Sequence, residues 1–277
     1  MTEVELDLGH LKLAGLSWGR EGPLVVLLHG WLDNAASFAA LAPFLDRGRF
    51  LALDWPGHGR SQHRANTGAY HFVDYVHDLD CVLDHLGEPV HLVGHSLGAL
   101  AAAAYAGTFA EKPLSLTLIE AMVPISAPAE EAPAILRKAI ESRRATRDRA
   151  RRPYPALDTM VRARAQAGGF GFELARPLVE RAARAVPGGF EWRSDRRLRT
   201  FSPLRLTREQ ALALVAGIRC PTQAILGEGG YLAQHPQRVA EDCAALGEHE
   251  LHWLPGGHHL HLEHPEPVAK LIYKMIT

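Results

Sequence analysis

Cysteine is scarce in this chain, which argues against a fold held together by disulfides. Three cysteines occur among 277 residues, at the scattered positions Cys81, Cys220 and Cys243. An odd number of widely spaced cysteines is typical of free thiols in a reducing compartment. No two of them have the spacing of a metal-binding pair. With 47% hydrophobic residues, the chain is instead expected to depend on a substantial buried core.

An excess of one charge and a long apolar run are also missing. The formal net charge is −1, so we expect no nucleic acid and no membrane as a partner. The first ten residues are acidic and contain no long apolar stretch, so we expect neither a signal peptide nor a transmembrane span. The length allows one large domain, or one domain with an insertion. These absences predict a cytoplasmic protein.

The most informative stretch runs from Val90 to Leu100. An apolar run typical of a buried strand leads into an Ala-rich segment typical of a helix, and between them lies Gly94-His95-Ser96-Leu97-Gly98. A strand that turns directly into a helix needs one residue in a strained, often positive-φ conformation, and glycines give such a turn room. The G-x-S-x-G pattern therefore predicts a nucleophile elbow with Ser96 exposed at the turn.

Strand-like and helix-like segments alternate through most of the chain. Residues 4–8 and 11–18 alternate apolar and polar side chains around Gly9-His10, which predicts an antiparallel hairpin. Further strands are predicted at 24–28, 50–53, 114–119, 220–226 and 250–254, and helices at 37–45, 72–86, 99–106, 236–246 and 265–276. This alternation is typical of the α/β class, with a mostly parallel sheet covered by helices on both faces.

Segment 124–210 breaks the alternation. It is Arg-rich, is interrupted by prolines, and shows helical patterns at 134–149 and 177–185 but no strand pattern. We therefore predict a helical cap, or lid, at 124–210, inserted into a core formed by 1–123 and 211–277. Its arginines either line a basic substrate lip or form a solvated, salt-bridged surface, which is the commoner role of charge-rich helices.

Four motifs then occur in the order that α/β-hydrolases show. They are His29-Gly30 after the strand at 24–28, the turn from Asp54 to Ser61, the G-x-S-x-G elbow, and Gly257-His258 followed by Glu263 and Pro265. The chain resembles the α/β-hydrolase superfamily over nearly its whole length outside the insertion. Residues 28–35 and 193–210 resemble its serine hydrolase-like (Kraken-type) subgroup. The resemblance implies an α/β-hydrolase fold, a cap after the sixth strand, and no cofactor.

A serine needs a neighbouring base before it can attack a carbonyl. His258 stands between the last strand and the last helix, where the resemblance places the catalytic histidine, and an imidazole exchanges protons near neutral pH. His259, His261 and His264 lie close by, and a histidine-rich tract can also bind a metal. No acidic or cysteine cluster accompanies the tract, so we expect His258 to be the base and no metal to be bound.

The acid that should orient this histidine is less obvious. Most of the superfamily places an aspartate after the strand that here ends at Leu226, but the matching slot is Gly230, and Glu228 lies slightly earlier. The resemblance offers a second place at the end of the preceding strand. One class of haloalkane dehalogenases keeps a glutamate there, and this chain has Glu120. We expect Glu120 to be the acid, with Glu228 as the alternative and a chain without any acid as the third possibility.

An oxyanion needs preorganised N–H donors. The resemblance implies that the backbone amides of Leu97, after the nucleophile, and Trp31, after the third strand, supply them. It assigns Asp54 and His58 to a structural turn without chemistry.

Together these residues predict a hydrolase that cleaves a carboxylic ester or thioester of a small molecule through an acyl-enzyme on Ser96. Dehalogenases and epoxide hydrolases of this fold use an aspartate nucleophile, so they are disfavoured. A cofactor-free haloperoxidase or perhydrolase would use the same triad. A non-catalytic binding protein with the same fold is the alternative of another class, and the missing acid at Gly230 is its best support. We expect a monomer or a small homo-oligomer.

Overall fold

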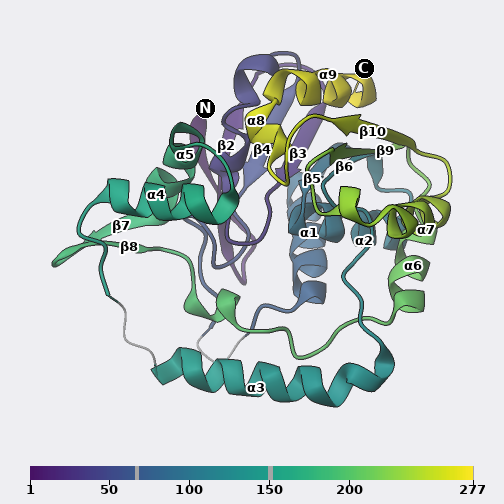
Figure 1. Cartoon of the computed structure of the whole chain (residues 1–277). Coiled ribbons are helices and arrows are strands. Elements are labelled where there is room, and N and C mark those ends of the chain that lie inside the picture. Colours follow the sequence, from purple (N-terminus) through teal and green to yellow (C-terminus); the bar gives the residue numbers. More distant parts are fainter. Residues whose placement is uncertain (66–68, 149–151, 277) are drawn as a thin grey trace.

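The computed structural model describes residues 1–65, 69–148 and 152–276 and contains one central sheet of eight strands (Figure 1). The order across the sheet is β1-β2-β4-β3-β5-β6-β9-β10. The strands are β1 (Thr2–Asp7), β2 (Lys12–Trp18), β3 (Leu24–Leu28), β4 (Arg49–Leu53), β5 (Val90–His95), β6 (Pro113–Ile119), β9 (Thr222–Gly227) and β10 (Glu250–Leu254). The β1–β2 and β2–β4 pairs are antiparallel, and the other five pairs are parallel. The predicted α/β class and N-terminal hairpin are confirmed.

Helices cover both faces of the sheet. One apolar core packs the sheet against α1 (Phe72–Leu86), α2 (Leu97–Thr108), α6 (Arg208–Ala216) and α7 (Pro236–Leu246). A second core on the other face includes the 3₁₀ helix Ala35–Phe38, α8 (Leu260–Glu263) and α9 (Pro265–Ile276). Because β3 lies between the two helical layers, all five of its residues are buried. In the described part of the chain, no helix has both the length and the apolar character to cross a membrane.

The local sequence signals locate most elements well. The predicted boundaries of β3, α1, α7, β10 and α9 agree with the structure, and Gly87 ends α1 in the left-handed conformation expected of a C-terminal stop. The continuous helix predicted at 37–45 is wrong. Two 3₁₀ helices, Ala35–Phe38 and Ala42–Phe44, stand there instead. Pro43 lacks the N–H donor that a continuous helix would need at that point.

Segment 124–210 follows β6, has elements of its own, and includes the first three residues of α6 (Figure 1). They are α3 (Ala132–Asp148), α4 (Leu157–Gly168), α5 (Phe172–Ala182), β7 (Ala183–Val186) and β8 (Gly189–Trp192). The prediction of no strand is wrong, because β7 and β8 pair as an antiparallel hairpin turned by Gly188 and Gly189, both at positive φ. Short 3₁₀ helices complete the chain at Ala129–Glu131, Arg196–Arg199 and Leu232–Gln234.

The two helices predicted within this segment fare differently. The helix predicted at 134–149 corresponds to α3, although its predicted last residue, Arg149, lies outside the described residues. The helix predicted at 177–185 is wrong in its bounds. The observed helix, α5, begins five residues earlier, after Gly171. It contains Pro177 and ends where β7 starts.

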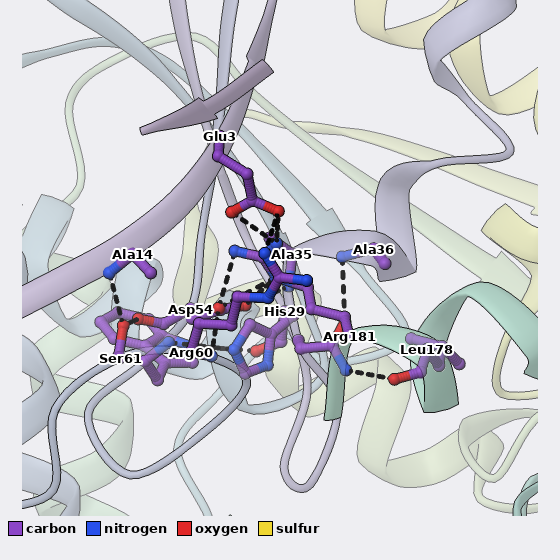
Figure 2. A network of polar contacts seen from close by, with 12 residues as sticks. Glu3, Ala14, His29, Ala35, Ala36, Asp54, Arg60, Ser61, Leu178 and Arg181 are labelled. Atoms are coloured by element: carbon purple, nitrogen blue, oxygen red, sulfur yellow. Dashed lines mark hydrogen bonds and ion pairs between the residues drawn. The ribbon is translucent and has the colours of Figure 1, made fainter. Parts of the chain in front are cut away.

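A buried ion-pair network ties α5 to the core (Figure 2). The Arg181 side chain is 4% exposed; its Nε lies 3.0 and 2.9 Å from the two Asp54 carboxylate oxygens, and its Nη1 donates to Glu3 of β1. The Asp54 carboxylate also accepts the Ala35 and Arg60 backbone N–H groups, each at 2.7 Å. A buried carboxylate with this many donors is satisfied in place. The contacts of Asp54 thus fix the turn after β4 and hold α5 against it.

Candidate active site

Ser96 lies at the sharp turn between β5 and α2, with φ 50° and ψ −115°. The flanking glycines make the turn possible. A Cβ on Gly94 would lie 2.5 Å from the Ala99 backbone nitrogen, and a Cβ on Gly98 would lie 2.0 Å from the Leu28 carbonyl oxygen. Neither position can hold a larger residue without moving the backbone. The local geometry is therefore that of a nucleophile elbow.

Residues with a strained backbone conformation lie at the same edge of the sheet. Among the described non-glycine residues, only Leu32, Ser96 and Glu120 have positive φ, at 62°, 50° and 56°. They follow β3, β5 and β6, which are neighbours in the sheet. Such conformations cost on the order of 1–3 kcal/mol each and cluster at functional sites. Their convergence marks the carboxyl edge of these strands as the candidate site.

Glu120 and His258 meet at this edge. Oε2 of Glu120 lies 3.3 Å from Nδ1 of His258, and Oε1 accepts the Gly227 backbone N–H at 2.6 Å. The Glu120 side chain is fully buried, whereas the His258 side chain is 41% exposed. One imidazole nitrogen thus faces a fixed carboxylate, which leaves Nε2 for a second partner.

Glu228, the alternative acid, lies elsewhere. It is exposed in the turn after β9, and its backbone N–H donates to the Leu254 carbonyl of β10 at 2.9 Å. Within the described chain, the carboxylate that bonds to His258 is that of Glu120.

His95, the second residue of the elbow motif, holds the loop that carries His258. Its Nε2 lies 2.8 Å from the His258 carbonyl oxygen, so this nitrogen carries the proton and donates. Burial, reinforced by neighbouring histidines, holds the pKa of His95 well below its usual range. His95 is therefore a neutral donor at working pH. The elbow motif thus contributes to the position of His258 as well as of Ser96.

His259 and His261 of the tract face inward. His261 is fully buried and its Nε2 lies 2.8 Å from the Ser37 hydroxyl, while burial lowers the pKa of His261 to about 3. His259 lies 3.4 Å from the carboxylate of Asp33, a residue to which the sequence analysis assigned no role. Asp33 lies in the 28–35 stretch that resembles the subgroup, and this resemblance was the signal in the sequence that could have pointed to Asp33.

Of the two expected oxyanion donors, Leu97 follows Ser96 in the chain, and Trp31 lies in the stretch after β3. Leu97 is the first residue of α2, so its N–H has no acceptor within the helix. Gly30 packs against the elbow, because a Cβ on it would lie 3.2 Å from Cβ of Ser96, and Trp31 follows directly. The Trp31 indole donates to the Leu198 carbonyl in segment 124–210 at 2.9 Å.

Metal-ligating side chains gather at a different place. In the described chain, one group of three has ligand atoms within 4.8 Å of one another: His10 of the β1–β2 turn with His77 and Cys81 of α1. None of the three belongs to the elbow or to the histidine-rich tract.

The chain is similar to known hydrolases along its length. The alpha/beta hydrolase family model matches residues 25–271. A serine hydrolase-like protein of Danio rerio is 28% identical over 98% of this chain and 87% of its own. A hypothetical protein of Pseudomonas aeruginosa PAO1 is 41% identical with a TM-score of 0.91, over 99% of this chain and 98% of its own. A thioesterase domain from the curacin biosynthetic pathway is 28% identical with a TM-score of 0.89, over 99% of both chains. The chain belongs to the alpha/beta hydrolase family, in its serine hydrolase-like subgroup.

Proposed function

We propose that this protein is a serine hydrolase that cleaves a carboxylic ester or thioester through an acyl-enzyme on Ser96. The observation that carries the proposal is the 3.3 Å contact between buried Glu120 and Nδ1 of His258, at the sheet edge where the elbow presents Ser96. Similarity to a thioesterase domain supports an acyl substrate. A serine in the nucleophile position argues against the aspartate-dependent chemistry of dehalogenases and epoxide hydrolases.

In the proposed first half-reaction, Ser96 Oγ attacks the acyl carbonyl while His258 Nε2 takes the hydroxyl proton. Negative charge on the carbonyl oxygen is stabilised by the Leu97 and Trp31 N–H groups. The C–O or C–S bond then breaks, and His258 gives its proton to the leaving alcohol or thiol. Glu120 fixes the imidazole tautomer and stabilises the imidazolium.

In the second half-reaction, a water molecule gives its proton to His258 and its oxygen attacks the acyl-enzyme. The bond to Ser96 Oγ breaks, the carboxylic acid leaves, and the proton returns to Ser96. Every proton thus passes through one imidazole, and no metal or organic cofactor is needed to balance the reaction.

We further propose that segment 124–210 acts as a cap over this site. It leaves the sheet directly after Glu120, and its Leu198 carbonyl accepts the Trp31 indole N–H. Large apolar side chains stand exposed on it, among them Leu136 at 47% and Ile140 at 43%, one turn apart on α3. An acyl chain would give these side chains an apolar partner.

The decisive experiment is labelling with a fluorophosphonate probe, read by mass spectrometry, together with turnover of p-nitrophenyl and acyl-thioester substrates. We expect the probe to modify Ser96 in the wild type. The Ser96→Ala variant should lose about 10⁴-fold or more in turnover while keeping its thermal stability, because little packing is removed at this turn. A wild type that neither labels nor hydrolyses any substrate would favour the non-catalytic binding protein instead.

A further inference from the structure

A buried polar cluster lies directly behind His258 and includes one residue from segment 124–210. Its members are Asp33 and Ser37 from the stretch after β3, His95 from the elbow, His259 and His261 from the histidine-rich tract, and Arg164 from α4. Burying a charge costs folding free energy unless the charge is paired. A buried charged cluster that holds none of the reacting atoms therefore needs a physical reason.

Asp33 and Arg164 form the charged centre of this cluster. The Asp33 side chain is 1% exposed and accepts a short hydrogen bond from Arg164 Nη2. The same Nη2 lies 3.2 Å from His259 Nε2, which in turn lies 3.4 Å from Asp33 Oδ2. Burial alone would raise the pKa of Asp33, but His259 and the Arg164 guanidinium hold it well below the usual range. Asp33 is therefore an anion, and Arg164 is its permanently charged partner.

The surroundings are built to hold the Arg164 guanidinium in this place. The guanidinium carbon lies 4.8 Å from the Phe170 ring centroid, and the Phe170 ring meets the His259 ring edge-on at 4.7 Å. Gly168 leaves the necessary space, because a Cβ there would lie 2.4 Å from Arg164 Nη1. Phe170 is itself 7% exposed, so the ion pair is shielded from water.

We infer that Arg164 is a positioning residue for the catalytic base: by pairing with Asp33 and contacting His259 it balances the charge beside the base and holds the His258 loop in its productive place. The inference rests on the proposed role of His258. If Arg164 were absent, the nearest group able to compensate Asp33 would be His259, the chain neighbour of His258. Protonation of His259 would then go together with a loss of activity. The uncompensated negative charge of Asp33 would also favour the protonated form of His258.

The groups that face this centre come from every element packed around it. They are Asp33, His95, His258, His259, His261, Glu120 and Arg164. His95 and His261 have pKa values held low by burial, so they do not compete for the proton near neutral pH. The charge balance at Asp33 thus depends on a residue of segment 124–210, which links the position of that segment to the state of the base.

The test compares Arg164→Met, Arg164→Lys and the double variant Asp33→Asn/Arg164→Met. Arg164→Met should lower kcat at pH 7 about ten-fold with little change in KM, and should move the acid limb of the kcat/KM profile about one pH unit higher. The double variant should return the acid limb toward the wild-type position, because both charges are gone. Arg164→Lys should fall between them. Arg176→Met, which removes an arginine paired with Asp158 on the segment surface, is the matched control and should change neither parameter.

The inference is overturned if Arg164→Met keeps the wild-type pH profile. It is also overturned if Arg164→Met loses activity without a pH shift and the double variant with Asp33→Asn does not restore that activity. Histidine NMR titration of the Ser96→Ala background reads the same charge balance without turnover. There His259 should take up its proton at higher pH once Arg164 is replaced, and an unchanged titration also counts against the inference. If the wild type proves inactive while this NMR shift occurs, the proposed function fails and the electrostatic link stands.

Discussion

The carboxylate of Glu120 occupies the space that a side chain at Gly230 would need. A Cβ built on Gly230 would lie 2.4 Å from Oε2 and 2.5 Å from Oε1 of Glu120. Position 230 is the slot where the superfamily resemblance expects the acid, so a side chain at 230 would force the Glu120 carboxylate out of its contacts with Gly227 and His258. The two positions also differ in backbone conformation: residue 120 has a positive φ, whereas Gly230 does not.

Moving the acid to the other slot should therefore be possible, but only in a double variant. Gly230→Asp alone should lose most activity, because its side chain collides with Glu120. The combination Glu120→Gly/Gly230→Asp should regain turnover relative to either single variant, since glycine tolerates the backbone at 120. Turnover of a p-nitrophenyl ester measures both. Wild-type activity in Gly230→Asp would show that the two positions do not share one space.

Glu120→Gln should lower kcat by about 10²- to 10⁴-fold. The amide keeps the shape of the side chain but cannot stabilise an imidazolium, and it favours the wrong imidazole tautomer. Glu228→Gln is the matched control and should stay within a factor of about two, because Glu228 is exposed in its turn. Steady-state kinetics on both variants checks this, and a larger loss in Glu228→Gln than in Glu120→Gln would reverse the assignment of the acid.

Stability should fall as the pH drops below about 6.5. Burial lowers the pKa of His29 to about 4, and the pKa values of His58 and His261 to about 3. The unfolded chain therefore binds more protons between those values and about 6.5, so stability is complete above this window and is lost as pH falls through it. Each such histidine costs about 2 kcal/mol on going from pH 6.5 to 5.

Urea denaturation at pH 8, 6.5 and 5 measures this loss. The free energy of unfolding should be about 1 kcal/mol lower at pH 6.5 than at pH 8, because the unfolded histidines are then half-protonated, and it should be clearly lower again at pH 5. His58→Gln removes one of the three groups and should flatten the decline, whereas His235→Gln, at an exposed position, should leave it unchanged. A free energy of unfolding that stays constant from pH 6.5 to 5 would contradict the prediction.

Substitutions on α3 should change substrate preference more than stability. Leu136→Ser and Ile140→Ser should shift the preferred p-nitrophenyl ester toward shorter acyl chains, with changes in unfolding free energy within about 0.5 kcal/mol, as for other surface positions. Leu114→Ser is the matched control, since Leu114 is 46% exposed near the opposite, amino end of β6. An unchanged chain-length profile would mean that α3 does not contact the acyl group.

Local signals in the sequence predicted the elements that are defined by hydrophobic periodicity and by Gly or Pro at their ends. The five-residue apolar run of β3, the helical stripe of α1 and the Gly-x-Ser-x-Gly turn carry their information within a few neighbouring residues. The same reasoning failed at β7 and β8, which are four residues each and only half-buried, so their side chains show little alternation. It also failed at 37–45, where Pro43 interrupts an otherwise helical pattern.

The sequence by itself determined the sheet class, the elbow at Ser96 and the family, because these depend on motifs and their order along the chain. Which carboxylate stands beside His258 was open between Glu120 and Glu228, and only the tertiary structure decided it. The Glu120 N–H donates to the Ile225 carbonyl across the β6–β9 pair, which carries its side chain to the Gly227 amide and His258. Likewise Arg164 and Asp33 meet across 131 residues of sequence. Pairing over such separations is set by how strands and helices pack, and no local pattern encodes it.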